Sequence, residues 1–270
     1  PNNQIPLSRF NPVSRNLLSD PNLYPLPISP DLRFNAVNGV SSKVITDQGD
    51  AKGDVALTEK DRLMVRFSNG RQDRPGINSF PLIFDSFNRA PFKAGVANWT
   101  RTLSPTVVNE ARVGVNRVVL ENGGTDKGLG NAAEQLGISR GNERGPGLMS
   151  IQFDGGLSTN LGSANIGRQT LFANNTYQIN DNLTVVLGRH IVKSGFMYMR
   201  SQQNTFFAGN NGRTGFLRFN GQFTSGPNAN SPTQGTGFAE ADFVLGNPAR
   251  LGRGVDTGTW GHRQNIWATY

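Results

Sequence analysis

Hydrophobic and polar residues alternate along several long segments of the chain with a period of two residues. The longest such segment runs from Leu171 to Leu187, where odd positions are mostly apolar and even positions mostly carry amides or hydroxyls. A period of two predicts a β-strand with one apolar and one polar face. At about 3.3 Å per residue this strand is far longer than a usual globular strand. The alternative is a hairpin that turns at Asn180-Asp181-Asn182.

The same alternation recurs in three further segments. Their apolar series are Leu63, Val65 and Phe67; Ala97, Trp99 and Leu103; and Val107, Ala111, Val113, Val115 and Val119. The opposing series, polar except for Met64, are Arg62, Met64 and Arg66; Asn98, Thr100 and Thr102; and Glu110, Arg112 and Asn116. In a soluble sandwich the apolar faces would meet a second sheet, whereas in a membrane barrel they meet lipid and the polar faces line the interior.

The connections between these segments favour the barrel. Short turns at 58–61, 104–106 and 188–190 alternate with long polar loops at about 70–92, 121–167 and 204–260. Outer-membrane barrels have short periplasmic turns and long outer loops, whereas a sandwich rarely tolerates loops of this length. The loops are rich in glycine and asparagine, so we expect surface segments that are mobile or fold over the barrel mouth.

The pattern therefore predicts an all-β fold, an antiparallel up-and-down transmembrane β-barrel. Residues 43–270 would form a partial barrel of roughly 8 strands. Residues 1–42 are interrupted by prolines, which cannot donate to a strand ladder, and are predicted to be an extracellular loop segment with one helical turn at Val13–Leu18. The start resembles no signal peptide, and both ends are expected to be cut points in a longer chain.

Composition narrows the functional classes. No run approaches the roughly 18 to 20 apolar residues of a transmembrane helix, and 36% of the 270 residues are hydrophobic. The net charge is +8 and the pI about 10.3. Because arginine and lysine are spread singly along the chain, we expect no nucleic-acid partner. Cysteine is absent, which excludes disulfides and thiolate chemistry.

Candidate catalytic and cofactor motifs are weak. His190 and His262 are the only histidines, and neither has a partner at metal-ligand spacing. Gly128–Ala133 mimics a dinucleotide fingerprint but follows a polar, glycine-rich stretch instead of a strand. Sequence alone does not exclude a carboxylate pair for glycoside hydrolysis, but nothing singles out the four candidates Asp54, Asp61, Glu110 and Asp154. We therefore expect no enzyme, no metal and no cofactor.

Aromatic and basic residues give mixed evidence about the membrane boundary. Five aromatic residues are candidates either for a girdle at that boundary or for ordinary strand packing: Trp99, Tyr177, Trp260, Trp267 and Tyr270. Arg101 and Arg117 fall on apolar faces, which is unfavourable at the bilayer midplane. We expect both to lie near strand ends, where their side chains can snorkel to the headgroups.

Eight sequence segments, taken in order, are distributed over nearly the whole length of the chain. They are IPLSRFNPVSRNLL, LYPLPI, DVALTEKDRLMVRFS, FNRAPFKAGV, WTRTLSPTVVNEARVGVNRV, NTYQINDNLTVVLGRHIVKSGFMYMR, AEADFVLGNP and RQNIWATY. With these strings the chain resembles the barrel of Oar-like TonB-dependent receptors. The resemblance implies that the SPT and GRH turns face the periplasm and that ADFVLG lies outside. It also implies an N-terminal carboxypeptidase-regulatory-like domain, a plug and further strands, which this sequence lacks, so the piece would form an open arc.

The predicted function is ligand binding and uptake across the outer membrane. The candidate lumen-facing ligand contacts are Arg62, Arg66, Glu110, Arg112, Asn116, Asn174, Thr176 and Gln178. The expected partners are outer-membrane lipid, an unknown polar or anionic ligand and, by resemblance, the TonB complex acting through the absent plug. The alternative is a secreted or surface β-rich adhesion or carbohydrate-binding module without a pore, which would need no detergent. A glycan-active enzyme would instead require two carboxylates roughly 5 to 10 Å apart.

Overall fold

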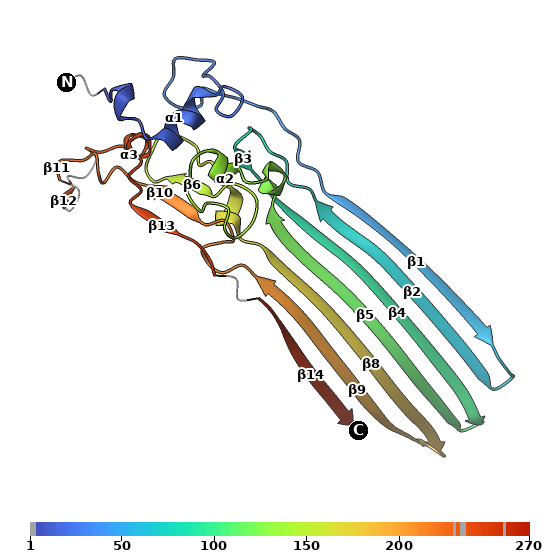
Figure 1. Cartoon of the computed structure of the whole chain (residues 1–270). Coiled ribbons are helices and arrows are strands. Elements are labelled where there is room, and N and C mark those ends of the chain that lie inside the picture. The colour runs from blue at the N-terminus through green and yellow to red at the C-terminus, as the bar shows by residue number, and fades with distance from the viewer. Residues whose placement is uncertain (1–3, 229–230, 233–235, 256–257) are drawn as a thin grey trace.

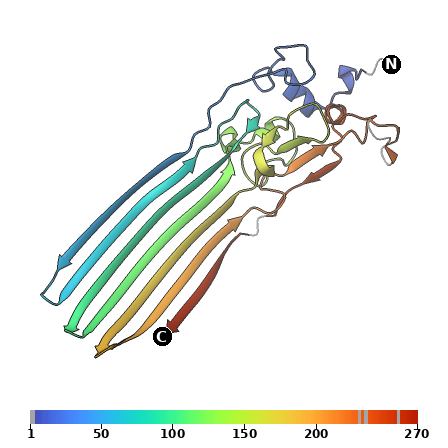
Figure 2. The same ribbon diagram turned by 180° about the vertical axis from the view of Figure 1, so that it is seen from behind.

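A computed structural model shows an open sheet of long antiparallel strands with a folded cap at one end (Figure 1). It describes residues 4–228, 231–232, 236–255 and 258–270. The strands of the sheet are β1 (Ile45–Ala56), β2 (Asp61–Arg74), β4 (Ser86–Ser104), β5 (Val107–Gly124), β8 (Thr170–Leu187), β9 (His190–Phe207) and β14 (Thr259–Thr269). Each pairs with the next in this order, and Figure 2 shows the same arrangement from behind. The all-β, up-and-down fold is confirmed, with seven strands in this sheet among the described residues and an unclosed edge at β1 and at β14.

The segment 171–187 forms one continuous strand. Asn180, Asp181 and Asn182 pair with β5 on one side and β9 on the other, in the middle of both ladders. The hairpin alternative is therefore wrong. The physical reason is that neighbours on both sides satisfy the backbone N–H and C=O groups, which outweighs the local turn preference of asparagine and aspartate.

The connections are short at one end of the sheet and long at the other. The short turns occupy residues 57–60, 105–106 and 188–189. In the last of these, Gly188 has a φ of 58°, a conformation that glycine adopts without steric cost. At the other end the long connections cover 75–85, 125–169 and 208–258, because the strands there, except β8, extend further than predicted.

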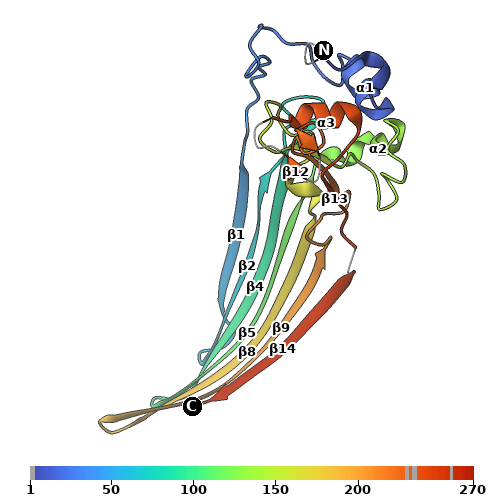
Figure 3. The ribbon, with the colours of Figure 1, turned by 90° about the vertical axis from the view of Figure 1, so that its left-hand side faces the viewer.

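The long connections fold together into a cap. A small sheet of β6 (Ser150–Phe153), β10 (Phe216–Phe219) and β13 (Arg250–Gly252) packs with α1 (Pro12–Ser19), α2 (Ala132–Gln135) and α3 (Ala239–Leu245). Shorter elements are η1 (Leu7–Arg9), β3 (Ile83–Phe84), η2 (Asp126–Leu129), β7 (Gly162–Ser163), η3 (Ala164–Gly167), β11 (Pro227–Asn228) and β12 (Ser231–Pro232). Figure 3 shows the sheet from its side, curved along its length, with the cap at its upper end. Of the helices described, none is long and apolar enough to cross a bilayer.

The cap has its own hydrophobic core. The ring of Phe243 packs edge-on against Phe153 and Phe219, with centroids 5.4 and 5.3 Å apart. Leu17 of α1 is fully buried in the same cluster, so the proline-rich N-terminal segment is part of the cap. Asn11 begins α1, because its side chain accepts from the N–H of Val13 at 2.9 Å.

The two faces of the main sheet differ in chemistry. In an antiparallel pair, directly opposed residues project from the same face, so the register defines an apolar face and a polar face. One row of the apolar face is Gly53, Val65, Ala97, Val113, Ile179, Tyr198 and Trp267. Val113 and Val115 are 51% and 53% exposed. No second sheet covers this face in the described part of the chain, in contrast to a sandwich, so it is free to contact lipid.

Two of the five girdle candidates are on the wrong face for lipid contact. Trp99, Tyr177 and Trp267 project from the apolar face. Trp260 pairs with Thr205 on the polar face, and the hydroxyl of Tyr270 contacts Asn182 there. The reason lies in the period of two, because positions three and seven residues from Trp267 must point the opposite way.

The two arginines of the apolar face have different positions along their strands. Arg101 lies near the turn end of β4, 3.7 Å from Asp61 and above the ring of Trp99. Arg117, in contrast, lies inside β5, which continues to Gly124. The expectation that Arg117 lies near a strand end is wrong, because β5 continues several residues past the point where the apolar part of its face ends. Its side chain sits just beyond that part, next to Asn175.

Candidate functional site

All eight residues predicted to face the lumen project from the polar face. Arg62 and Arg66 come from β2, Glu110, Arg112 and Asn116 from β5, and Asn174, Thr176 and Gln178 from β8. The register places Asn116 opposite Thr176, and Gln178 opposite Gly114. The polar face therefore carries a surface of amides, hydroxyls and charged groups. The neighbouring strands β5 and β8 bring six of the candidates together there, whereas β4 separates Arg62 and Arg66 from them.

A shallow hollow lies at the centre of this surface, and we call it the lumenal hollow. It has a volume of about 190 Å³ and is lined by Gly95, Val96, Arg112, Gly114, Val115, Asn116, Thr176 and Gln178. Four of the predicted ligand contacts are among these residues. The hollow exists because Gly114 has no side chain, and the nearest atom to a Cβ added there would be the Gly95 carbonyl oxygen at 3.9 Å.

Carboxylates neutralise much of the positive charge on the polar face. Arg66 lies 2.9 Å from Asp50, and Arg112 lies 2.9 Å from Glu110. Arg112 also donates to the Asn98 amide oxygen at 3.2 Å. Arg62 is exposed and has no ion pair among the described residues. The surface is thus richer in neutral hydrogen-bonding groups than in free cations.

Asn174 supplies one unsatisfied group on the polar face. Its amide oxygen is buried and has no hydrogen-bond partner within the described residues. A buried acceptor without a partner costs free energy unless water or a ligand donates to it. Asn174 is therefore the predicted contact whose amide most clearly requires an external donor.

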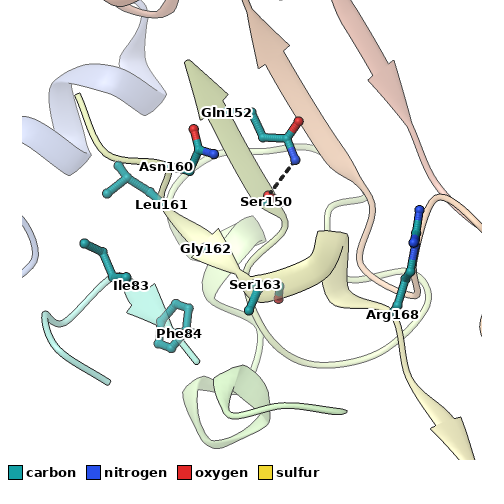
Figure 4. A pocket seen from close by; sticks show the side chains of 10 residues that line it. Ile83, Phe84, Ser150, Gln152, Asn160, Leu161, Gly162, Ser163 and Arg168 are labelled. Carbon is teal, nitrogen blue, oxygen red and sulfur yellow. Dashed lines mark hydrogen bonds between the residues drawn. The ribbon is translucent and has the colours of Figure 1, made fainter. Parts of the chain in front are cut away.

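A larger cavity lies in the cap, and we call it the cap cavity (Figure 4). It has a volume of about 410 Å³ and is lined by Ile83, Phe84, Ser150, Gln152, Asn160, Leu161, Gly162, Ser163, Ala164 and Arg168. None of these described lining residues is a carboxylate. The Gln152 amide donates to the Ser150 hydroxyl at 3.3 Å, and Arg168 donates to the carbonyl oxygen of Asn210 at 3.0 Å. The arrangement offers hydroxyl, amide and guanidinium groups beside an apolar wall.

Sequence reasoning missed the cap cavity. Most of its residues come from segment 150–168, which has no regular period. They come together because β3 pairs in parallel with β7, and Ile151 bridges to Leu161. The available signal was weak: isolated apolar residues within a glycine-rich loop are compatible with a small local core.

An ion cluster joins two of the long connections in the cap. Arg140 lies 2.8 Å from Glu143, and Arg253 lies 2.7 Å from the same carboxylate. The hydrogen bond from Arg140 is the main cause that lowers the pKa of the Glu143 carboxyl, and the positive charges of both arginines add to it. Glu143 therefore stays ionised and holds residues 140–143 against Arg253.

The motifs considered for catalysis are dispersed. Asp54 and Glu110 lie on the polar face with two strands between them, Asp61 lies on the apolar face, and Asp154 pairs with Arg218 in the cap. No cluster of three metal-ligating side chains occurs among the described residues. His190 follows the turn after β8, and His262 lies on the polar face of β14 opposite Gln203. Residues 128–133 form short helical turns that lead into the four-residue α2.

A family model described as outer membrane beta barrel domain matches residues 1–270, the whole chain. Neither the curated proteins nor the solved structures contain a significant match. The family places the protein in the outer membrane, in agreement with the exposed apolar face of an unclosed antiparallel sheet. The chain belongs to the outer membrane beta barrel domain family.

Proposed function

We propose that this chain is part of the barrel of a TonB-dependent receptor that binds a polar solute and admits it across the outer membrane. The observation that carries the proposal is the placement of all eight predicted contacts on one face, with the exposed apolar face behind them. This is the arrangement of a barrel with a polar interior. The proposed role is binding and transport, without catalysis.

The side chains that line the lumenal hollow and the cap cavity suggest the class of solute. The lumenal hollow presents Asn116, Thr176 and Gln178 beside an arginine that Glu110 already neutralises. The cap cavity adds serine and amide groups, with Arg168 as its cation. Such surfaces complement a hydroxyl-rich or weakly anionic solute better than a strongly anionic one.

The energy source is inferred from the resemblance. In TonB-dependent receptors a plug inside the barrel couples uptake to the TonB complex, and this chain would form part of the wall around that plug. A solute that first contacts the cap cavity would pass to the lumenal hollow once the plug moves.

The test uses the whole receptor, first purified and then in cells. A panel of polar solutes is first screened by the thermal stabilisation they give to the purified receptor, and a stabilising solute is then followed in uptake assays. Deletion of TonB should abolish its uptake. Gly114→Leu should reduce binding and uptake, because the new side chain fills the lumenal hollow and no positive φ opposes it.

Gly53→Leu is the matched control. It adds the same side chain on the apolar face, where nothing lies within 4 Å of an added Cβ. Unchanged uptake in the Gly114→Leu receptor would refute the role of the lumenal hollow. Full uptake without TonB would refute the receptor class.

A surface-binding role for the cap is the second candidate. A groove of about 350 Å³ between residues 23–36 and the rest of the cap is lined in part by Tyr24, Phe34, Phe80 and Leu82. Phe34 is 92% exposed, and exposed aromatic rings are typical of binding surfaces. If adhesion is the function, Phe34→Ala should abolish attachment to a glycan surface, and attachment should not depend on TonB.

A further inference from the structure

The apolar face changes character abruptly about halfway along the strands. On β5 the residues projecting from this face between Val107 and Val115 are mostly apolar, a span close to the roughly 9 to 11 residues with which a strand crosses a bilayer. The next row toward the cap is entirely polar apart from the glycine of β1. It consists of Asn69, Lys93, Arg117, Asn175, Gln202 and Arg263, paired one strand after another. We call this the basic row.

Two cations of the basic row face each other directly. Lys93 pairs with Arg117 across β4 and β5, and both side chains are exposed. Like charges directly opposed across a ladder destabilise a sheet. Arg117 donates to the Asn175 amide oxygen at 2.8 Å, which does not neutralise its charge. An anion outside the sheet would remove this repulsion.

The remaining cations at this level also lack carboxylate partners. Arg263 donates to neutral acceptors, among them the His262 carbonyl oxygen at 2.8 Å and the Asn204 amide oxygen at 3.0 Å. Arg200, one step closer to the apolar region, has no ion pair within the described part of the chain. Closer to the cap on the same face, in contrast, Arg71 lies 2.8 Å from Asp47 and Arg89 lies 3.6 Å from Glu121. On this face of the described strands, the arginines without a carboxylate partner therefore lie at the edge of the apolar region.

We infer that the basic row binds the phosphate groups of anionic lipid headgroups in the outer leaflet. Its level supports this assignment, because it follows the apolar region directly on the side of the long outer loops. Long basic side chains at that boundary reach headgroups while their aliphatic stems stay against acyl chains. A lipid phosphate between Lys93 and Arg117 accepts from both and screens their repulsion. The inference is independent of the transported solute.

The experiment compares two double variants of the whole receptor in phosphatidylcholine nanodiscs doped with labelled diphosphorylated lipid A. Lys93→Gln/Arg117→Gln removes the opposed pair. Arg71→Gln/Arg89→Gln removes the same charge from the same face, but at positions with carboxylate partners. Each basic side chain near a charged lipid surface strengthens binding about fivefold. Loss of two such side chains should therefore weaken the binding of lipid A by the first variant about 25-fold. The control variant should bind like the wild type.

Two further measurements test whether the lipid phosphates are what the basic row recognises. Lipid A without its phosphates should bind wild type and variants equally, which separates phosphate recognition from sugar contacts. Diphosphorylated lipid A should raise the Tm of the wild type and not that of Lys93→Gln/Arg117→Gln, with folding of each checked by heat-modifiable gel migration. Equal lipid A binding by the two double variants, or competition by inorganic phosphate alone at equal concentration, overturns the inference.

Discussion

Truncation of one aromatic side chain should open the cap while leaving the sheet intact. Phe243 is 5% exposed and packs edge-on against Phe153 and Phe219 at 5.4 and 5.3 Å. Phe→Ala at a buried site costs about 3 to 5 kcal/mol, which includes the lost ring contacts and the cavity left behind. If opening is local, this cost corresponds to an increase of about 140- to 3700-fold in the population of the open cap.

Limited proteolysis and hydrogen exchange of the whole protein in detergent measure this effect. In Phe243→Ala, peptides from 208–258 should exchange and be cleaved faster by that factor, while those from β8 and β9 should keep their protection. Phe223→Ala is the matched control, because Phe223 lies in the same connection and is 43% exposed. The reasoning fails if both variants behave alike, or if the strands of the main sheet lose protection together with the cap.

Three further predictions concern the faces, the cap and pH. Val113→Arg, on the apolar face, should destabilise the protein by about 2 to 4 kcal/mol in urea unfolding from bilayers, and Asn116→Arg on the polar face should change it little. Gly246→Val should loosen the cap in hydrogen exchange, because Gly246 has a φ of 76° and an added Cβ would overlap a neighbouring side chain. The stabilisation from ionised Glu143 is present above its ordinary pKa of 4.5 and should be lost as the pH falls through its lower folded pKa. Proteolysis near Arg140 should therefore increase below about pH 4.5 in the wild type, and Glu143→Gln should remove this dependence.

The period of two in the sequence determines which side chains share a face. Because neighbouring strand residues always point in opposite directions, the position of Arg112 in its strand already places it with Glu110 and Asn116. The same rule assigns Trp260 and Tyr270 to the polar face, although aromatic character alone suggests a lipid-facing girdle. The fold class and the polar candidates were therefore predictable from local pattern.

Register and long-range packing are decided only by the tertiary structure. No local pattern shows that Lys93 lies opposite Arg117 or that Gly114 opens a hollow, because both depend on how far one strand slides against the next. The cap depends on contacts such as that from the Ser14 hydroxyl to the carbonyl oxygen of Val244, 230 residues away. The loop sequence shows no regular period, and its core forms only when these distant segments exclude water together.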